Sequence, residues 1–422
     1  MIPLLFFVTF PTWLAIAWRK YVRNKAEDRG GPEPRSIILF RLDQLGDLVL
    51  TTPLFRELRR LYPRARIAVA IQPQHMAILT TNRHIDEILT FHLLPGKWPS
   101  GRSRTLASAL WFYWTELRHR QFDLAISPRW DLDENLATML CAMTHARKKV
   151  GHSACSSAPK LKFNRGFDAA YDTVIPASPV QHEVDRNLAV ITVLGGEVQN
   201  RQPEICLSES DCCFAAELLK HHEQRRLLVA LGIGGRAAGR RWPLERYAEL
   251  VNRLNQQHRI QPVIVCSEEE DGDASALSMK LQVPPFILSG VPLRKVCAVL
   301  ERCDLFVGND TGTAHLAAAM QCPTVVISRH PANGDPAHPN SPARFAPRCT
   351  HYRVLQPQGA AAGCTTSCRS SAAHCILGVT VERVMETTTE LLTIGIQESP
   401  YVSRLGYQLP HASTQATVAG VV

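Results

Sequence analysis

The sequence predicts an α/β protein of two Rossmann-like domains, each with a parallel sheet. Short apolar runs alternate with segments of helical periodicity over most of the chain, which is typical of parallel α/β architecture. The 422 residues exceed what one hydrophobic core normally holds, so more than one domain is expected. Polar motifs follow several of the apolar runs, and the carboxyl ends of parallel strands are where such sheets bind ligands.

Four strands are expected in the first half, at residues 37–42, 67–71, 85–91 and 122–127. A helix is expected at 47–62, where leucines recur at mostly helical spacing. Pro53 falls within its first two turns, where a missing N–H costs least. Periodicity is weaker over 151–202, and a helix at 182–194 leads into a hinge.

Five strands are expected in the second half, at residues 227–231, 263–266, 286–288, 305–307 and 324–327. A last helix at 380–392 is expected to pack onto one of the halves. These elements place the domains at 35–205 and 206–395, followed by a flexible tail at 396–422.

The first eighteen residues carry no charged side chain and are followed by four basic residues within 19–25. This pattern favours a membrane anchor, with residues 1–34 as anchor and linker, although Pro3 and Pro11 weaken a helix. A cleaved signal peptide is the alternative, but its positive charges would precede the apolar segment. Because basic flanks stay inside, the body of the protein is expected in the cytoplasm.

A net charge of +9 implies attraction to polyanions: nucleic acid, anionic lipid or a phosphorylated substrate. Aromatic residues between the basic ones are too few for a base-stacking platform, and no zinc-finger spacing is present. Nucleic acid is therefore not an expected partner.

The most informative motif is Gly-Asn-Asp-Thr-Gly-Thr-Ala-His-Leu at 308–316, directly after an expected strand. A strand that ends in small and hydroxyl residues and enters a helix offers free backbone N–H groups to a phosphate. His315 lies four residues after Thr311, so it could contact a diphosphate, or it could simply pack against the helix.

Two further turns carry candidate functional residues. After the first strand, the turn at 41–47 holds Asp43 and Asp47; Asp47 could act as a general base or only cap the next helix. The turn at 232–243 combines glycines with arginines that suit a phosphate, although it is not a full dinucleotide fingerprint. Glu268 follows the next strand, where it could bind ribose hydroxyls or belong to a solvated loop.

Metal sites are only weakly indicated. The acidic pairs 131/133 and 271/273 match a D-x-D spacing, which is short enough to arise by chance. Most of the 13 cysteines lie in expected strands or helices, which suits reduced thiols. Cys364, Cys368 and Cys375 lie beside His374 and could bind zinc or form a disulfide, but a thiol-rich loop without metal is the simpler interpretation.

In combination, the Gly-Asp turn, the Arg-Arg-Trp-Pro sequence and the Asp-Thr-Gly-Thr-Ala-His element resemble glycosyltransferase family 9, the bacterial heptosyltransferases that build the lipopolysaccharide inner core. The resemblance covers about residues 36–392. It implies a GT-B fold and an inverting transfer from a nucleotide sugar, ADP-heptose in the best-known members, with no catalytic metal or cofactor.

The resemblance also implies roles for individual residues. Asp47 matches the general base, and Asp43 and Gly46 on the same turn are expected to contact the acceptor. The expected donor-binding residues are Arg240, Arg241, Glu268, Asp310, Thr311, Gly312, Thr313 and His315. The implied partners are a nucleotide-diphosphate sugar, a lipid-linked glycan acceptor and the membrane surface, on the cytoplasmic side of the bacterial inner membrane.

The sequence departs from the family pattern at three places. Arg240 replaces the usual lysine, residues 328–331 lack the Gly-x-Thr often found there, and a membrane anchor is unusual in the family. The alternatives are a noncatalytic GT-B protein that binds nucleotides or glycans, and a related enzyme, a transferase or an epimerase-like protein, that uses another nucleotide sugar.

Overall fold

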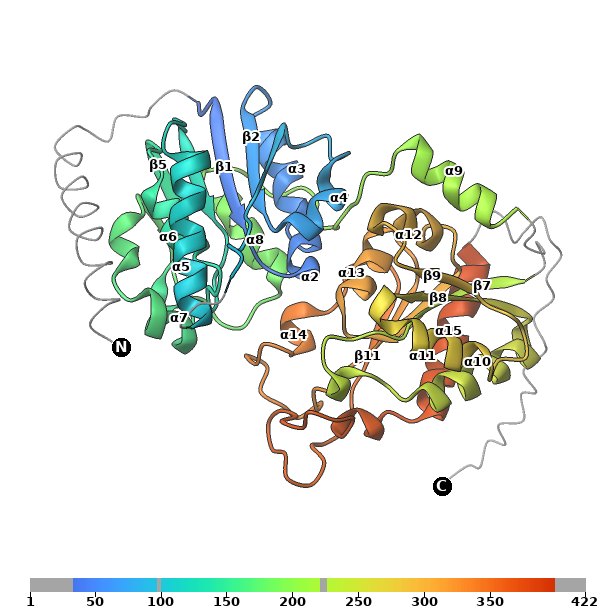
Figure 1. Ribbon diagram of the computed structural model, residues 1–422. Helices are drawn as coiled ribbons and strands as arrows, with labels where there is room; N and C mark the ends of the chain where they lie inside the picture. Colours follow the sequence, from blue (N-terminus) through green and yellow to red (C-terminus); the bar gives the residue numbers. More distant parts are fainter. Residues whose placement is uncertain (1–32, 97–99, 221–225, 399–422) are drawn as a thin grey trace, which may run out of the picture.

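The computed structural model describes residues 33–96, 100–220 and 226–398, and it contains two parallel sheets in two facing halves (Figure 1). The first sheet has the strands β1 (Ser36–Arg41), β2 (Arg66–Ile71), β3 (Glu87–Thr90), β4 (Leu124–Ser127), β5 (Lys148–His152) and β6 (Thr173–Ile175). The second has β7 (Leu227–Gly232), β8 (Ile260–Cys266), β9 (Phe286–Ser289), β10 (Leu305–Asn309), β11 (Thr324–Ile327) and β12 (Tyr352–Leu355).

Both sheets have the same strand order. The first runs β3-β2-β1-β4-β5-β6, and the second, taken from its other edge, runs β9-β8-β7-β10-β11-β12. This is the doubly wound order whose direction reverses between the first and fourth strands, the point at which such sheets bind ligands. The two switch points therefore lie between β1 and β4 and between β7 and β10.

Helices cover both faces of the first sheet, because successive residues of its buried strands point to opposite sides. Ile37 and Leu39 pack with α3 (Thr52–Leu61) and α8 (Glu183–Val193). Ile38 and Phe40 pack with α5 (Gly101–Phe112) and α6 (Ala137–Met143) on the other face. The shorter helices of this half are α2 (Leu45–Val49), α4 (Met76–Leu79) and α7 (Ala158–Asn164).

The second half follows the same plan, and one apolar cluster joins it to the first half. Its helices are α9 (Glu209–Leu218), α10 (Leu244–His258), α11 (Asp271–Ser278), α12 (Leu293–Leu300), α13 (Gly312–Ala319), α14 (Pro342–Phe345) and α15 (Val381–Glu398). Helices α2 and α4 of the first half contact α13 and α12 of the second. The two switch points therefore face each other across this contact.

The predicted alternation of strands and helices is confirmed, with corrections at the weaker elements. The sequence missed β5, β6 and β12, of which β5 contains two lysines and a histidine, β6 has three residues, and β12 lies at a sheet edge. The single helix expected at 47–62 is wrong, since α2 and α3 are separate. Pro53 has no N–H for the carbonyl of Val49, and the hydroxyl of Thr52 donates to that carbonyl at 2.8 Å instead.

Among the residues that the structure describes, no helix is both long and apolar enough to cross a bilayer. The anchor expected within residues 1–34 lies almost entirely outside the described residues, as does most of the tail expected at 396–422.

Candidate active site

The turn between β1 and α2 presents Asp47 at the edge of the first sheet. The carboxylate accepts a hydrogen bond from the backbone N–H of Gln44 at 3.3 Å, so it does cap α2. It also lies 3.4 Å from Nη2 of Arg41 and 3.5 Å from Nη1 of Arg129. Its side chain remains 14% exposed. Capping engages the oxygen Oδ2, and the two arginines contact the other oxygen, Oδ1.

Asp47 belongs to a buried cluster of alternating charges. Asp43 pairs with Arg41 at 3.3 Å and with Arg129 at 3.5 Å, and Arg41 donates to Glu183 at 2.6 Å. Burial raises the pKa of Asp47 to about 6, although the two arginines lower it. Burial would also raise the pKa of Glu183, but here Arg41 and Arg129 prevail and lower it to about 2. The environment of the cluster therefore pushes the pKa values of Asp47 and Glu183 apart, in opposite directions from their ordinary values.

Sequence reasoning missed Arg129 and Glu183, which complete this cluster. Arg129 follows β4, and β4 pairs directly with β1, so its position after an apolar strand was a usable signal. Glu183 enters from α8, far along the chain, and is held by the indole N–H of Trp130. Only the fold brings that residue to β1, and no local pattern could have found it.

In the second half, Asn309 organises the turn after β7. Its side-chain amide donates to the carbonyls of Ile233 and Gly234, both at 2.9 Å, and its oxygen accepts the backbone N–H of Trp242 at 2.9 Å. A buried asparagine at the end of β10 therefore fixes both ends of the glycine- and arginine-rich turn. This residue was part of the quoted motif but had no predicted role.

The two arginines of that turn point to different acids. Arg240 pairs with Asp310 at 3.1 Å, beside the start of α13. Arg241 pairs with Glu270 at 3.2 Å and with Asp273 at 3.0 Å. Arg240 is thus the arginine that the structure places beside the Asp-Thr-Gly-Thr motif.

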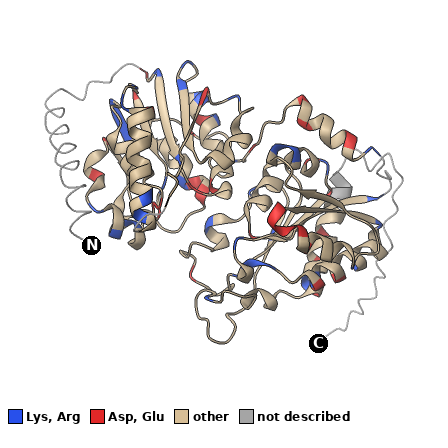
Figure 2. Ribbon diagram, viewed as in Figure 1, with Lys and Arg blue, Asp and Glu red and all other residues tan. Residues whose placement is uncertain are grey.

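Glu268 and Glu270 lie on the short helix Glu268–Glu270 before α11. The carboxylate of Glu270 accepts the backbone N–H of Gly235 at 3.0 Å, and a Cβ added at Gly234 would lie 2.3 Å from it. Glu268 is exposed and lies against Gly290 instead. The acid in contact with the glycine turn is therefore Glu270, and a donor contact for Glu268 stays a prediction. Figure 2 shows acidic residues on this short helix and on the α2 turn.

Helix α13 begins at Gly312, and Thr311 and Thr313 lie in or beside its first turn. His315 is buried within it, and burial lowers the pKa of this imidazole to about 4. Its Nδ1 has no hydrogen-bond partner among the described residues. A neutral imidazole with a free nitrogen lies next to a helix N-terminus, where N–H groups are also unpaired.

Glycines let the two switch points touch. A Cβ added at Gly46 would lie 2.7 Å from Cδ2 of His315, and one added at Gly312 would lie 2.8 Å from Cδ2 of Leu45. Any larger residue at either position would force the halves apart. Gly46 of the first half thus lies directly against His315 of the second, and Leu45 lies against Gly312.

The D-x-D pairs serve other purposes. Asp131 forms a buried ion pair with Arg344 of the second half at 2.6 Å, and Asp133 accepts the backbone N–H groups of Ala137 and Thr138. Asp273 pairs with Arg241, as described above. The chance interpretation of these acidic pairs agrees with these contacts.

Two Rossmann-type halves, whose switch points face each other and carry these motifs, form the architecture of the GT-B class of glycosyltransferases. The chain belongs to glycosyltransferase family 9 (heptosyltransferase), whose family model matches residues 111–331. This confirms the resemblance, the GT-B fold and the class of enzyme.

Named relatives are identical to this chain at about a quarter of the aligned residues. The lipopolysaccharide core heptosyltransferase OpsX of Haemophilus influenzae is 23% identical over 298 residues, which are 69% of this chain and 78% of that protein. The lipopolysaccharide heptosyltransferase 3 of Escherichia coli K12 is 24% identical over 297 residues, with 67% and 79% covered.

Solved structures share the fold at lower identity. The glycosyltransferase family 9 protein of Veillonella parvula has a TM-score of 0.65 at 20% identity, covering 85% of this chain and 97% of that one. The E. coli ADP-heptose lipopolysaccharide heptosyltransferase II has a TM-score of 0.61 at 18% identity, covering 86% of this chain and 100% of that one.

Proposed function

We propose that this protein transfers a heptose from ADP-heptose, with inversion at the anomeric carbon, to a lipopolysaccharide core or a related lipid-linked glycan. The observation that carries the proposal is the position of Asp47, which lies on the α2 turn that packs against the first turn of α13. The names of the relatives, which are lipopolysaccharide heptosyltransferases, support this donor and acceptor.

Asp47 acts as the general base in this proposal. A carboxylate with a pKa of about 6 is mostly ionised at neutral pH yet basic enough to accept a proton from an attacking hydroxyl. Arg41 and Arg129 hold the carboxylate in place, and Asp43 balances their charge. Asp43 and Gly46 on the same turn would line the acceptor side.

The donor diphosphate would lie between the arginine turn and the start of α13. Arg240 is 27% exposed and paired to Asp310, so it can turn part of its guanidinium group to a phosphate. The first N–H groups of α13, the hydroxyls of Thr311 and Thr313, and neutral His315 would stabilise the charge that develops on the leaving diphosphate. These groups would do so without a catalytic metal.

A lipid-linked acceptor requires the enzyme to approach a membrane, and the first half has a suitable surface. Trp111 at the end of α5 and Trp114 in the helical segment Tyr113–Leu117 that follows it are each 58% exposed. Arg118 stacks over the Trp114 ring at 3.9 Å, and Arg102 over Phe163 of α7 at 4.0 Å. Exposed tryptophans among arginines suit an interface with anionic lipid.

The test of the base combines binding and turnover. Purified wild type and Asp47→Asn would be titrated with ADP and other nucleoside diphosphates, and then assayed for transfer from ADP-heptose to a core acceptor. Asp47→Asn keeps the size of the side chain and removes the base, so kcat is expected to fall by about 10²- to 10⁴-fold. ADP affinity should be unchanged, because Asp47 is on the acceptor side.

A matched control is Glu301→Gln, which neutralises an exposed carboxylate at the end of α12. Full activity in Asp47→Asn would exclude Asp47 as the base. If the wild type prefers another nucleotide, its assignment as a transferase stands and the proposed donor is wrong.

A further inference from the structure

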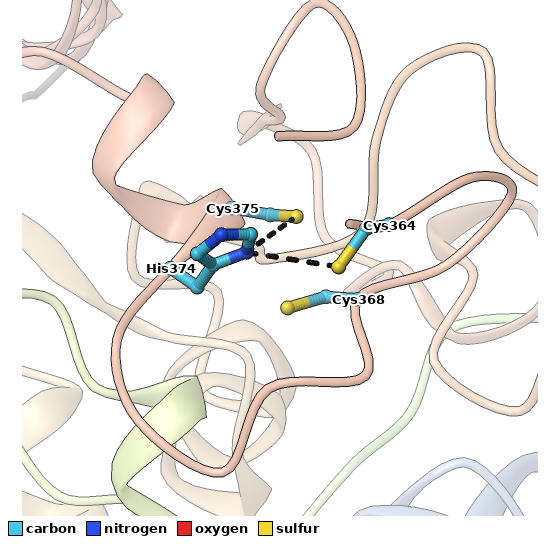
Figure 3. Close-up of side chains that lie close together, drawn as sticks. All are labelled: Cys364, Cys368, His374 and Cys375. Atoms are coloured by element: carbon cyan, nitrogen blue, oxygen red, sulfur yellow. Dashed lines mark hydrogen bonds between the residues drawn. The ribbon is translucent and has the colours of Figure 1, made fainter. Parts of the chain in front are cut away.

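The loop between β12 and α15 brings three thiols and one imidazole together. Residues 356–380 contain no regular structure except the short helix Cys375–Gly378. Within this loop the side chains of Cys364, Cys368, His374 and Cys375 converge (Figure 3). Their ligand atoms all lie within 4.8 Å of one another. Sequence spacing alone left zinc, a disulfide and unliganded thiols open for this group.

We propose that these four residues, termed here the Cys₃His cluster, bind one Zn²⁺ ion that holds this loop in place. Three cysteines and a histidine form one of the usual ligand sets of structural zinc. All four positions of a tetrahedral ion would be filled by the protein, which distinguishes this site from a catalytic one with an open position.

The distances fit a tetrahedral ion. With Zn–S bonds of about 2.3 Å and Zn–N bonds of about 2.0 Å, a sulfur and a nitrogen on one ion lie about 3.5 Å apart and two sulfurs about 3.8 Å apart. Nδ1 of His374 lies 3.6 Å from Sγ of Cys364 and 3.6 Å from Sγ of Cys375. A disulfide would use two of the sulfurs and would not account for an imidazole nitrogen at this distance from both.

The surrounding backbone also suits thiolates. The N–H of Arg369 points to Sγ of Cys364 at 3.5 Å, and that of Ala361 points to Sγ of Cys375 at 3.4 Å. Such N–H groups stabilise negative charge on the sulfurs and orient them toward a metal. Cys368 and Cys375 are buried, so two of the three thiols are shielded from solvent.

The loop that carries the cluster is bonded to the arginine turn of the active site. The backbone N–H of Gly239 donates to the carbonyl of Ser371 at 2.9 Å, and Arg329 donates to the carbonyl of Ser370 at 3.4 Å. A Cβ added at Gly239 would lie 2.7 Å from the latter carbonyl. Arg240 follows directly, so zinc would fix the backbone next to the proposed donor arginine. The zinc site itself does not depend on the proposed donor.

The test measures zinc in the full-length protein, purified without a polyhistidine tag or chelator from zinc-containing medium. Elemental analysis is expected to give about one zinc per chain for wild type. Cys364→Ser and Cys375→Ser should lose it, while Cys213→Ser, which changes an exposed cysteine on α9, should keep it.

A second measurement does not need the variants to fold. Titration of native wild type with a mercurial should release one zinc per chain to a colorimetric indicator, and protein grown with cobalt should show the visible bands of a tetrahedral thiolate site. A protein that neither carries zinc nor takes it up, a disulfide within the cluster, or iron in place of zinc would each overturn the proposal. Because these are metal measurements, they stand whether or not heptose transfer is found.

Discussion

Replacing Arg129 by methionine should move the pH dependence of catalysis, because Arg129 holds down the pKa of Asp47. The guanidinium Nη1 lies 3.5 Å from Oδ1 of Asp47, and both side chains are mostly buried, with 15% and 14% exposed. At this distance an effective dielectric constant between about 80 and 20 gives roughly 1 to 5 kcal/mol, or about 1 to 3.5 pKa units. Partial exposure favours the lower half of that range.

The direction follows from the base mechanism. Asp47 works only as a carboxylate, so activity falls as the pH drops through its pKa, which is about 6 in the wild type. Loss of Arg129 removes a positive charge and raises this pKa further. The acid limb of kcat/KM should therefore move from near pH 6 to about pH 7–8.

The assay is kcat/KM for heptose transfer between pH 5 and 10, with Arg302→Met as control, since Arg302 is an exposed arginine beyond α12. The control should keep the wild-type limb, and thermal unfolding would confirm that Arg129→Met is folded. An active Arg129→Met enzyme with an unchanged limb would refute the assignment of that limb to Asp47.

Two other predictions concern the contact between the halves. Gly312→Ala places a methyl group 2.8 Å from Cδ2 and 3.0 Å from Cβ of Leu45, so it should destabilise the protein by about 1–3 kcal/mol and raise the donor KM. Leu45→Ala in the same chain removes Cδ2 but keeps Cβ, so thermal unfolding and kinetic assays should show only part of both effects reversed. Arg344→Met leaves Asp131 buried without its ion-pair partner, although Asp131 keeps hydrogen bonds from Ser157 and a backbone N–H. Denaturant unfolding should show that the free energy of unfolding falls by about 3 kcal/mol, and adding Asp131→Asn in the same chain should restore most of it. If the double variant is as unstable as Arg344→Met, the loss of the ion pair is not the cause.

Much of the fold could be predicted because parallel strands buried on both faces form continuous apolar runs. The interior strands β1, β2, β4, β7, β10 and β11 follow this rule, and β5, which begins with two lysines, does not. The break between α2 and α3 could also have been inferred, since Pro53 cannot donate to the carbonyl of Val49 and the hydroxyl of Thr52 takes its place.

Only part of the candidate site could be predicted from the sequence. Asp47, Gly46 and the Asp-Thr-Gly-Thr motif lie in local patterns whose glycines and carboxylates have a recognisable chemistry. The pKa of Asp47 depends on Arg129 after β4 and Glu183 at the start of α8, which are brought to β1 by the sheet order. Motifs therefore located the reactive groups, whereas the charges that tune them required the fold.

The contacts between the halves connect the local motifs with the charges that only the fold brings together. Asp131 and Arg129 both follow β4: Arg129 pairs with Asp47 at the candidate base, and Asp131 pairs with Arg344 of the second half. Lys160 of α7 donates to the carbonyl of Arg129 at 2.5 Å and so helps to hold this segment in place. The segment after β4 therefore carries both an ion pair between the two halves and the positive charge next to Asp47.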